Sequence, residues 1–278
     1  MSNLISSVFH RLKSSKLFYL CLAGAFLLSV FMMLNSCRVA LLLAADGWSS
    51  KTLDDCYFDI IPFMGFVCSL FCSLFVGVEY SNGTMRNKVV VGQTRTSIYF
   101  SFFTVNLAAS ELFTLVGAMG GLVGIPVLGT FNMGIKGAVI YILLAMLIAA
   151  AWAGIFTLIS MLVTDRAICA VTSILLFLIL LITASMMYNA LCEPEMISGA
   201  ILTANGIEMS DPEPNPSYIG GFMRDVYTFI VRATPVGQGI LLANLEMETP
   251  VFCAVSSVII TIITTVFGLA FFSKKDLK

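Results

Sequence analysis

Six long apolar segments, separated by shorter polar stretches, constrain this chain more than any other feature of its sequence. A helix needs about 20 mostly apolar residues to cross the hydrocarbon core of a bilayer, and each segment approaches or exceeds that length. The predicted spans are residues 17–37, 60–78, 98–123, 137–163, 167–188 and 251–272. We therefore expect an all-α integral membrane protein, with six transmembrane helices in a single transmembrane domain that covers residues 1–278.

The composition excludes the main soluble classes. Of the 278 residues, 59% are apolar and 11% are charged, whereas charged residues make up about a quarter of a soluble protein. The mean hydropathy is +0.97, and the formal net charge of −1 provides no basic surface for nucleic acid. The first apolar run is longer than the roughly 7–15-residue core of a cleavable signal peptide, so we expect it to be a retained span.

The distribution of basic residues predicts the orientation. With the amino terminus inside, ten lysines and arginines fall in inner segments and five in outer ones, and basic residues concentrate on the cytoplasmic side of membrane proteins. The inner ones are Arg11, Lys13, Lys16, Arg86, Lys88, Arg95, Arg166, Lys274, Lys275 and Lys278. We expect a multi-pass protein of the plasma membrane with both termini in the cytoplasm.

Two segments outside the spans are predicted to hold short helices. In residues 1–16, the apolar side chains recur at helical spacing on one face, which predicts an amphipathic interfacial helix on the inner leaflet. This helix either anchors the first span alone or also contacts a cytoplasmic partner. Residues 189–250 form an extracellular segment in which the Pro-rich stretch 210–217 cannot be helical. Short extracellular helices are expected in the apolar part that follows.

The cytoplasmic connection at residues 79–97 is richer than a passive turn requires. A connection between adjacent spans needs only a few residues, but this one reads EYSNGTMRNKVVVGQTRTS. Turn residues flank the short apolar run at 89–91, which indicates a short helix under the membrane. The simpler interpretation is a basic loop that only sets the topology.

The pattern EYxxGTxRxKxxxGxTR, which runs from Glu79 to Arg95, resembles the permease subunits of ATP-binding-cassette (ABC) exporters of the type-2 transporter family. The order of six spans and the string ATPVGQ at residues 233–238 are also similar to that family. The resemblance implies that residues 79–97 form a coupling helix that docks on an ATPase subunit. The residues it assigns to ATPase coupling are Glu79, Tyr80, Gly83, Thr84, Arg86, Lys88, Gly92 and Arg95.

The resemblance also implies a role for each of these positions. Glu79 and Tyr80 would end the second span. Gly83 and Thr84 would form the turn, with Thr84 as the cap of the coupling helix. Gly92 would end that helix. The basic residues Arg86 and Lys88 would face acidic groups of the ATPase or lipid phosphates, and Arg95 would lie at the inner headgroups; for the two arginines, topology alone is the competing explanation.

The expected partners follow from what the chain lacks. It contains no Gly-Lys dipeptide and hence no phosphate-binding loop, so we expect no enzymatic activity and no cofactor in this chain, with ATP and Mg bound by separate ATPase subunits. A second permease copy or a sister permease and membrane lipids are the other expected partners, and nucleic acid is not. The predicted cargo is hydrophobic or amphipathic (a peptide, drug or lipid-like molecule), so antimicrobial peptide export or immunity is one expected role.

Only one charged residue lies inside the predicted spans. Glu111, with Asn106 nearby, sits deep in the third span, where a charged group is costly. It is either a carboxyl group that packs two helices or a proton or cation site, and the second interpretation supports an alternative function as a secondary transporter or channel.

Cys56 and Cys192 both fall in outer segments, so they either form a disulfide or remain free thiols. The single histidine, His10, predicts no metal site.

Overall fold

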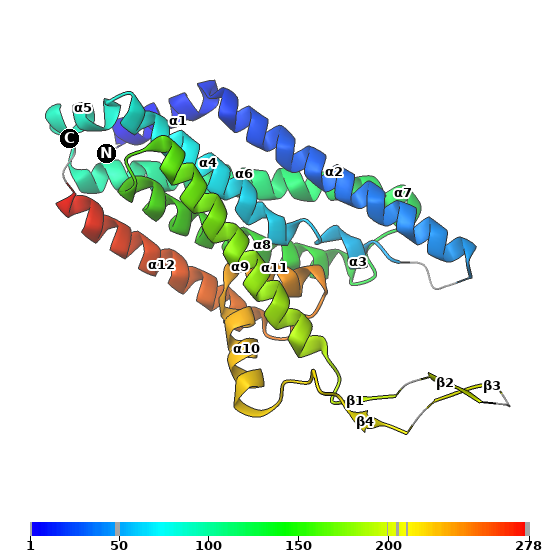
Figure 1. Ribbon diagram of the computed structural model, residues 1–278. Helices are drawn as coiled ribbons and strands as arrows, with labels where there is room; N and C mark the ends of the chain where they lie inside the picture. Colours follow the sequence, from blue (N-terminus) through cyan, green and yellow to red (C-terminus); the bar gives the residue numbers. More distant parts are fainter. Residues whose placement is uncertain (1, 48–50, 199, 204–205, 210, 276–278) are drawn as a thin grey trace.

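Six long helices form the body of the described part of the molecule, and Figure 1 shows how they are arranged. The computed structural model describes residues 2–47, 51–198, 200–203, 206–209 and 211–275, and within these ranges six helices are long and apolar enough to cross a membrane. They are α2 (Lys16–Ala45), α4 (Ile61–Ser81), α6 (Arg95–Gly121), α8 (Gly134–Leu162), α9 (Arg166–Cys192) and α12 (Pro250–Lys274). The predicted helical, membrane-spanning class is therefore confirmed. The first span is longer than expected, because α2 continues from residue 37 to Ala45.

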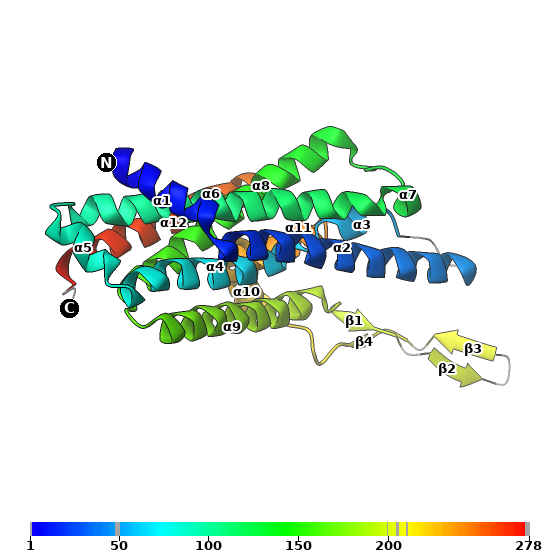
Figure 2. The same cartoon turned by 90° about the horizontal axis from the view of Figure 1, so that it is seen from above.

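Shorter elements gather at the two ends of this bundle. Both chain termini, helix α1 (Ser2–Ser14) and helix α5 (Thr84–Val90) lie at one end, which we call the terminal end (Figures 1 and 2). The opposite end is called the hairpin end, because a pair of β-ladders projects from it. The remaining short helices are α3 (Asp54–Tyr57), the 3-10 turn η1 (Leu122–Gly124), α7 (Ile125–Leu128), α10 (Gly221–Ala233) and α11 (Pro235–Ala243).

The segment between α9 and α12 contains strands that the sequence analysis did not predict. Strand β1 (Met196–Ile197) pairs antiparallel with β4 (Glu213–Pro214), and β2 (Ala200–Thr203) pairs antiparallel with β3 (Gly206–Met209). In the register, Ile197 lies opposite Glu213 and Thr203 opposite Gly206. The two ladders form one arm that extends away from the helices (Figure 2). The expected short helices follow this arm as α10 and α11.

Helix α4 forms the centre of the core. It packs against α9, α8, α2 and α11, and its aromatic side chains contact those of its neighbours. Phe71 stacks on Phe75 with ring centroids 5.1 Å apart and meets Phe113 of α6 edge-on at 5.2 Å. On the other side of α4, Trp152 of α8 meets Phe177 of α9 at 5.7 Å. Among the six long helices described, the one that contains α4 has the largest buried share, followed by α8.

Helices α10 and α11 form a sharply bent pair. Their axes differ by 90° at the break around Thr234, whose hydroxyl accepts a hydrogen bond from the Gly237 backbone N–H at 3.3 Å and caps α11. Helix α11 is buried among the long helices, whereas α10 projects outside them (Figure 1). The chain therefore re-enters the bundle as α11 before α12 begins.

Close packing of α6 on α2 depends on Gly120 of α6. A Cβ added at Gly120 would lie 2.9 Å from the Ser29 Cβ and 3.0 Å from the Phe26 carbonyl oxygen. We expect Gly120→Leu to destabilise the protein by about 1–3 kcal/mol, because the two helices must separate to accept the side chain. Thermal unfolding in detergent micelles measures the effect. Gly24→Leu on α2, where nothing lies within 4 Å, is the matched control and should be neutral or mildly stabilising; equal losses would contradict the packing argument.

Candidate functional site

A buried carboxylate at the terminal end connects three segments. Glu79 lies in the last turn of α4 with 4% of its surface exposed. It forms ion pairs with Arg11 of α1 and with Lys88 of α5, where the Lys88 Nζ is 2.7 Å from Glu79 Oε2. The Thr84 hydroxyl donates to the Glu79 carboxylate and, at 3.1 Å, to its backbone carbonyl. Glu79 therefore attaches both α1 and α5 to the end of α4.

Aromatic rings complete this cluster around the two cations. The Arg11 guanidinium donates to the Phe75 carbonyl, lies 4.1 Å above the Phe75 ring and is 5.7 Å from Phe102. The Lys88 ammonium is 4.5 Å from the Phe102 ring. Burial lowers the pKa of Arg11 to about 10 and that of Lys88 to about 8, with the nearby Arg11 charge adding to the second shift. Because both cations are partly desolvated, their charges depend on Glu79 for compensation.

The apolar face of α1 packs on protein. Leu4, Val8 and Leu12, which belong to the predicted apolar stripe, are buried, and α1 lies along α6. The helix at residues 2–14 is therefore as expected. The prediction that its apolar face lies on the inner leaflet is wrong for these three residues, because the pairing of Arg11 with Glu79 holds that face against the bundle.

A second group of contacts ties the other helix ends together. The Tyr80 hydroxyl donates to the Met161 carbonyl of α8 at 2.6 Å, and Lys275 Nζ donates to the same carbonyl at 2.9 Å and to Tyr80 Oη at 3.1 Å. Arg95 donates to the Phe272 carbonyl at 3.2 Å and to the Lys275 carbonyl. Burial lowers the pKa of Lys275 to about 8. Arg95 and Lys275 thus donate to carbonyl groups at the carboxyl-terminal ends of α8 and α12, where cations are favoured.

Helix α5 lies between two left-handed glycines, as the pattern of the loop predicts. Gly83 has a φ of 67° and Gly92 a φ of 91°, so both have a left-handed backbone conformation that residues other than glycine rarely adopt. Met85 points inward and is 1% exposed. The opposite face of α5 and the next residue are exposed, with Val90 and Val91 at 76% and 79%. The terminal end therefore presents an apolar and basic ridge: Arg86, Asn87, Val90 and Val91.

The geometry corrects two of the predicted roles in this loop. Gly83, not Thr84, precedes the first helical residue of α5, and Thr84 bonds Glu79 instead of capping the helix. Lys88 faces inward to Glu79, so its charge is not directed outward to lipid phosphates or an ATPase. Arg95 lies at the start of α6, as expected, and bonds the end of α12; its position at the headgroups stays a prediction. Arg86 is exposed, as expected.

No known protein family and no curated protein matches this sequence significantly. The role of the terminal end therefore has to be argued from its own residues. Sequence reasoning missed Arg11 and Lys275 as members of the site, since it treated both only as basic residues that set the topology. A signal existed for Arg11, because it lies three residues after Val8 and next to Leu12, at the border of the apolar stripe.

The two polar residues singled out in the third span, Asn106 and Glu111, differ in their hydrogen bonding. The Asn106 side-chain amide donates to Thr157 Oγ1 of α8 at 2.9 Å and so joins two helices. Three side-chain atoms of this span are buried without a hydrogen-bond partner within the described part of the chain: the Asn106 amide oxygen (Oδ1), the Ser110 hydroxyl and Glu111 Oε2. A carboxyl oxygen without a partner in a span is costly, so Glu111 remains a candidate proton or cation site.

The two cysteines that were candidates for an outer disulfide are free thiols in the structure. Cys56 is buried in α3, whereas Cys192 is exposed at the last residue of α9. Of the two interpretations left open by the sequence, the structure shows the one with free thiols.

Proposed function

We propose that this chain is the transmembrane permease subunit of an ATP-driven ABC exporter, with a separate ATPase that docks on α5. The observation that carries the proposal is the two-sided construction of α5. Its inner face is fixed to Glu79 through Lys88 and Thr84, while its outer face exposes Arg86, Val90 and Val91. A helix that is firmly attached on one side and exposed on the other can receive a force from a partner and pass it on.

The ion pairs give such a force a route into the spans. A displacement of α5 would act on α4 through Glu79 and on α1 through the Arg11 pair. The contacts of Tyr80 and Lys275 would carry it to the ends of α8 and α12. In the proposed mechanism, closure of the ATPase subunits on ATP moves α5, and the spans of two permease subunits rearrange to release a hydrophobic or amphipathic cargo outward.

In the proposed orientation, the chain lies in the plasma membrane and its terminal end faces the cytoplasm. The basic residues of α1, α5 and the two linking clusters all lie at this end, which agrees with the usual enrichment of lysine and arginine on the cytoplasmic side. Because ATP is cytoplasmic, this orientation also brings α5 to the side where an ATPase subunit works.

The proposal predicts that the outer face of α5 binds the ATPase. We expect the triple variant Arg86→Glu, Val90→Asp, Val91→Asp to abolish co-purification with a co-expressed candidate ABC ATPase, because it reverses a charge and makes an exposed apolar ridge acidic. The unfolding temperature should stay unchanged, since these side chains are exposed. Lys13→Glu, an exposed position on α1 at the same end, is the matched control. Retention of the complex by the triple variant, or a folded wild type that binds no ATPase, would overturn the proposal.

A second candidate function is secondary transport through Glu111. The observation in its favour is the buried, unpartnered carboxyl oxygen, together with the unpartnered Ser110 hydroxyl one residue before it. On this hypothesis, a proton gradient across vesicles that contain the purified chain alone would drive uptake or release of a cationic dye. Glu111→Gln would abolish that transport, whereas an ATPase-dependent exporter would show none without its partner.

A further inference from the structure

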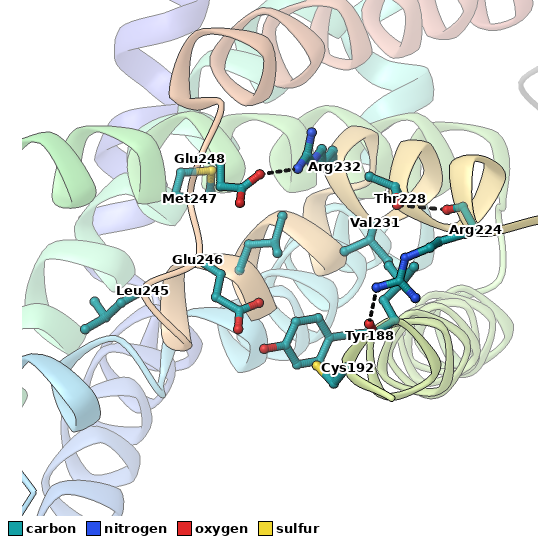
Figure 3. Close-up of a pocket in the computed structure, with 12 residues that line it drawn as sticks. Tyr188, Cys192, Arg224, Thr228, Val231, Arg232, Leu245, Glu246, Met247 and Glu248 are labelled. Atoms are coloured by element: carbon teal, nitrogen blue, oxygen red, sulfur yellow. Dashed lines mark hydrogen bonds and ion pairs between the residues drawn. The ribbon is translucent and has the colours of Figure 1, made fainter. Parts of the chain in front are cut away.

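A cavity lies at the hairpin end, away from the proposed coupling surface. Its volume is about 600 Å³, which is within the range of roughly 300–1,000 Å³ typical of small-molecule sites. The end of α9, the outer helix α10 and the residues that follow α11 enclose it (Figure 3). Leu191, Val231 and Leu241 supply apolar wall, so the cavity combines apolar surface with charged groups at its rim.

The two arginines of this cavity are already engaged. Arg232 Nη2 is 2.6 Å from Glu248 Oε2, and this pair lies along one side of the cavity (Figure 3). Arg224 donates to the Leu191 carbonyl at 2.8 Å and to the Ile219 carbonyl at 3.3 Å. Its guanidinium is therefore directed at the last turn of α9, where a cation is favoured. Neither arginine is free to dominate the binding of a ligand.

Glu246 supplies the charge that the cavity leaves available. In the described part of the chain, no ion pair compensates its carboxylate, which is exposed and has the Tyr188 hydroxyl as its neighbour. Figure 3 shows the hydroxyl of Tyr188 directed toward Glu246, with Arg224 on the other side of the Tyr188 ring. A carboxylate next to an aromatic ring, with apolar wall around them, is an arrangement that binds an ammonium group with an apolar substituent.

The backbone that presents Glu246 is strained. Leu245 has a φ of 59° and is the single non-glycine residue with a positive φ in the described ranges. It occupies the position after the end of α11 where glycine is usual, and the Glu246 N–H bonds the Leu241 carbonyl at 2.9 Å in the Schellman arrangement. The Leu245 side chain lines the cavity. The backbone conformation of Leu245 is energetically unfavourable, but its side chain adds apolar surface to the cavity wall.

We propose that this cavity binds the ammonium group of an amphipathic amine, with Glu246 and Tyr188 as the recognising residues. The apolar part of the amine would lie on Leu191, Val231 and Leu241. The site does not depend on an ATPase, so it stands or falls separately from the proposed exporter function. Two kinds of molecule could supply this ammonium group: a free amphipathic amine, or phosphatidylethanolamine through its headgroup.

The test uses the purified full-length chain in dodecyl maltoside micelles and three matched probes. Isothermal titration should show that 4-phenylbutylammonium binds at least tenfold more tightly than 4-phenylbutanol or 4-phenylbutyrate, because only the ammonium can pair with Glu246. Glu246→Gln should remove that preference, and Glu246→Lys should reverse it in favour of 4-phenylbutyrate. Glu213→Gln on the exposed strand β4 is the matched control and should bind as the wild type does.

Two further measurements complete the design. Tyr188→Leu keeps the apolar volume but removes the ring, and we expect several-fold weaker binding, which covers the case in which the Glu246 variants do not fold. Competition by added phosphatidylethanolamine would identify the lipid headgroup as the source of the ammonium, and lack of competition would identify a free amine. Equal affinity for the three probes, or unchanged binding by folded Glu246→Gln, would overturn the proposal.

Discussion

Replacing Glu79 by alanine is expected to release both α1 and α5 from the terminal end. The substitution leaves Arg11 and Lys88 partly buried without their anionic partner. Removing one member of a buried ion pair is strongly destabilising, because it leaves an uncompensated charge in a desolvated position. Because 29% of the Arg11 side chain and 18% of the Lys88 side chain reach solvent, we expect a loss of roughly 2–3 kcal/mol, below the range for fully buried pairs. Amide hydrogen exchange should rise in α1 and α5 before it rises in α4.

The control for this prediction is an exposed ion pair at the opposite end. Glu248 pairs with Arg232 but has 74% of its side chain exposed, so Glu248→Ala should change stability by less than about 1 kcal/mol. If the two alanine variants lose the same stability, Glu79 is not the group that holds the terminal end together. Uniform exchange across all helices in the Glu79 variant would point to global unfolding and would contradict the local role.

Replacing Gln238 by leucine is expected to loosen the re-entrant helix α11. The Gln238 side chain is fully buried. It donates to the Arg232 carbonyl at 3.0 Å and to Ser256 Oγ at 2.7 Å, and it accepts from Ser257 Oγ at 2.6 Å. Leucine has a similar size but leaves the buried Ser257 hydroxyl without its partner and removes one hydrogen bond each from the Arg232 carbonyl and the Ser256 hydroxyl. We expect a loss of about 1–3 kcal/mol, the cost of leaving a buried polar group unsatisfied. Thermal unfolding measures the loss.

The matched control is Gln93→Leu, which makes the same chemical change in a partly exposed loop. Its effect should stay within about 0.5 kcal/mol. Limited proteolysis adds a local readout, since cleavage around Thr234 should become faster in the Gln238 variant as α11 leaves the bundle. Wild-type cleavage together with an unchanged unfolding temperature would show that these hydrogen bonds do not hold α11.

The spans could be predicted because their signal is local. A run of apolar residues has to be helical in a bilayer whatever its neighbours are, since the backbone finds no other hydrogen-bond partners there. For the same reason the short helix at residues 84–90 was predictable, because Gly83 and Gly92 limit it through their own backbone conformations. The β-ladders at residues 196–214 were missed, since strands of two to four residues leave almost no periodic pattern.

The candidate site could be predicted only in part. The pattern from Glu79 to Arg95 located the correct end of the molecule, but it directed Lys88 outward and gave Thr84 a capping role. Both errors have one cause, which is that the burial of Glu79 depends on α1 and α6, and these lie elsewhere in the sequence. A lysine in an exposed loop and a lysine beside a buried carboxylate have the same sequence context.

The sequence by itself determined that this protein crosses a membrane, where its six long helices lie, and which connection departs from a passive turn. Only the tertiary structure decided that Arg11 and Lys88 share one buried carboxylate, that α11 re-enters the bundle, and that Glu246 borders a cavity. The physical reason is the range of the forces involved. Hydrophobicity acts on each segment separately, whereas charge compensation and cavity shape arise only when distant segments pack together.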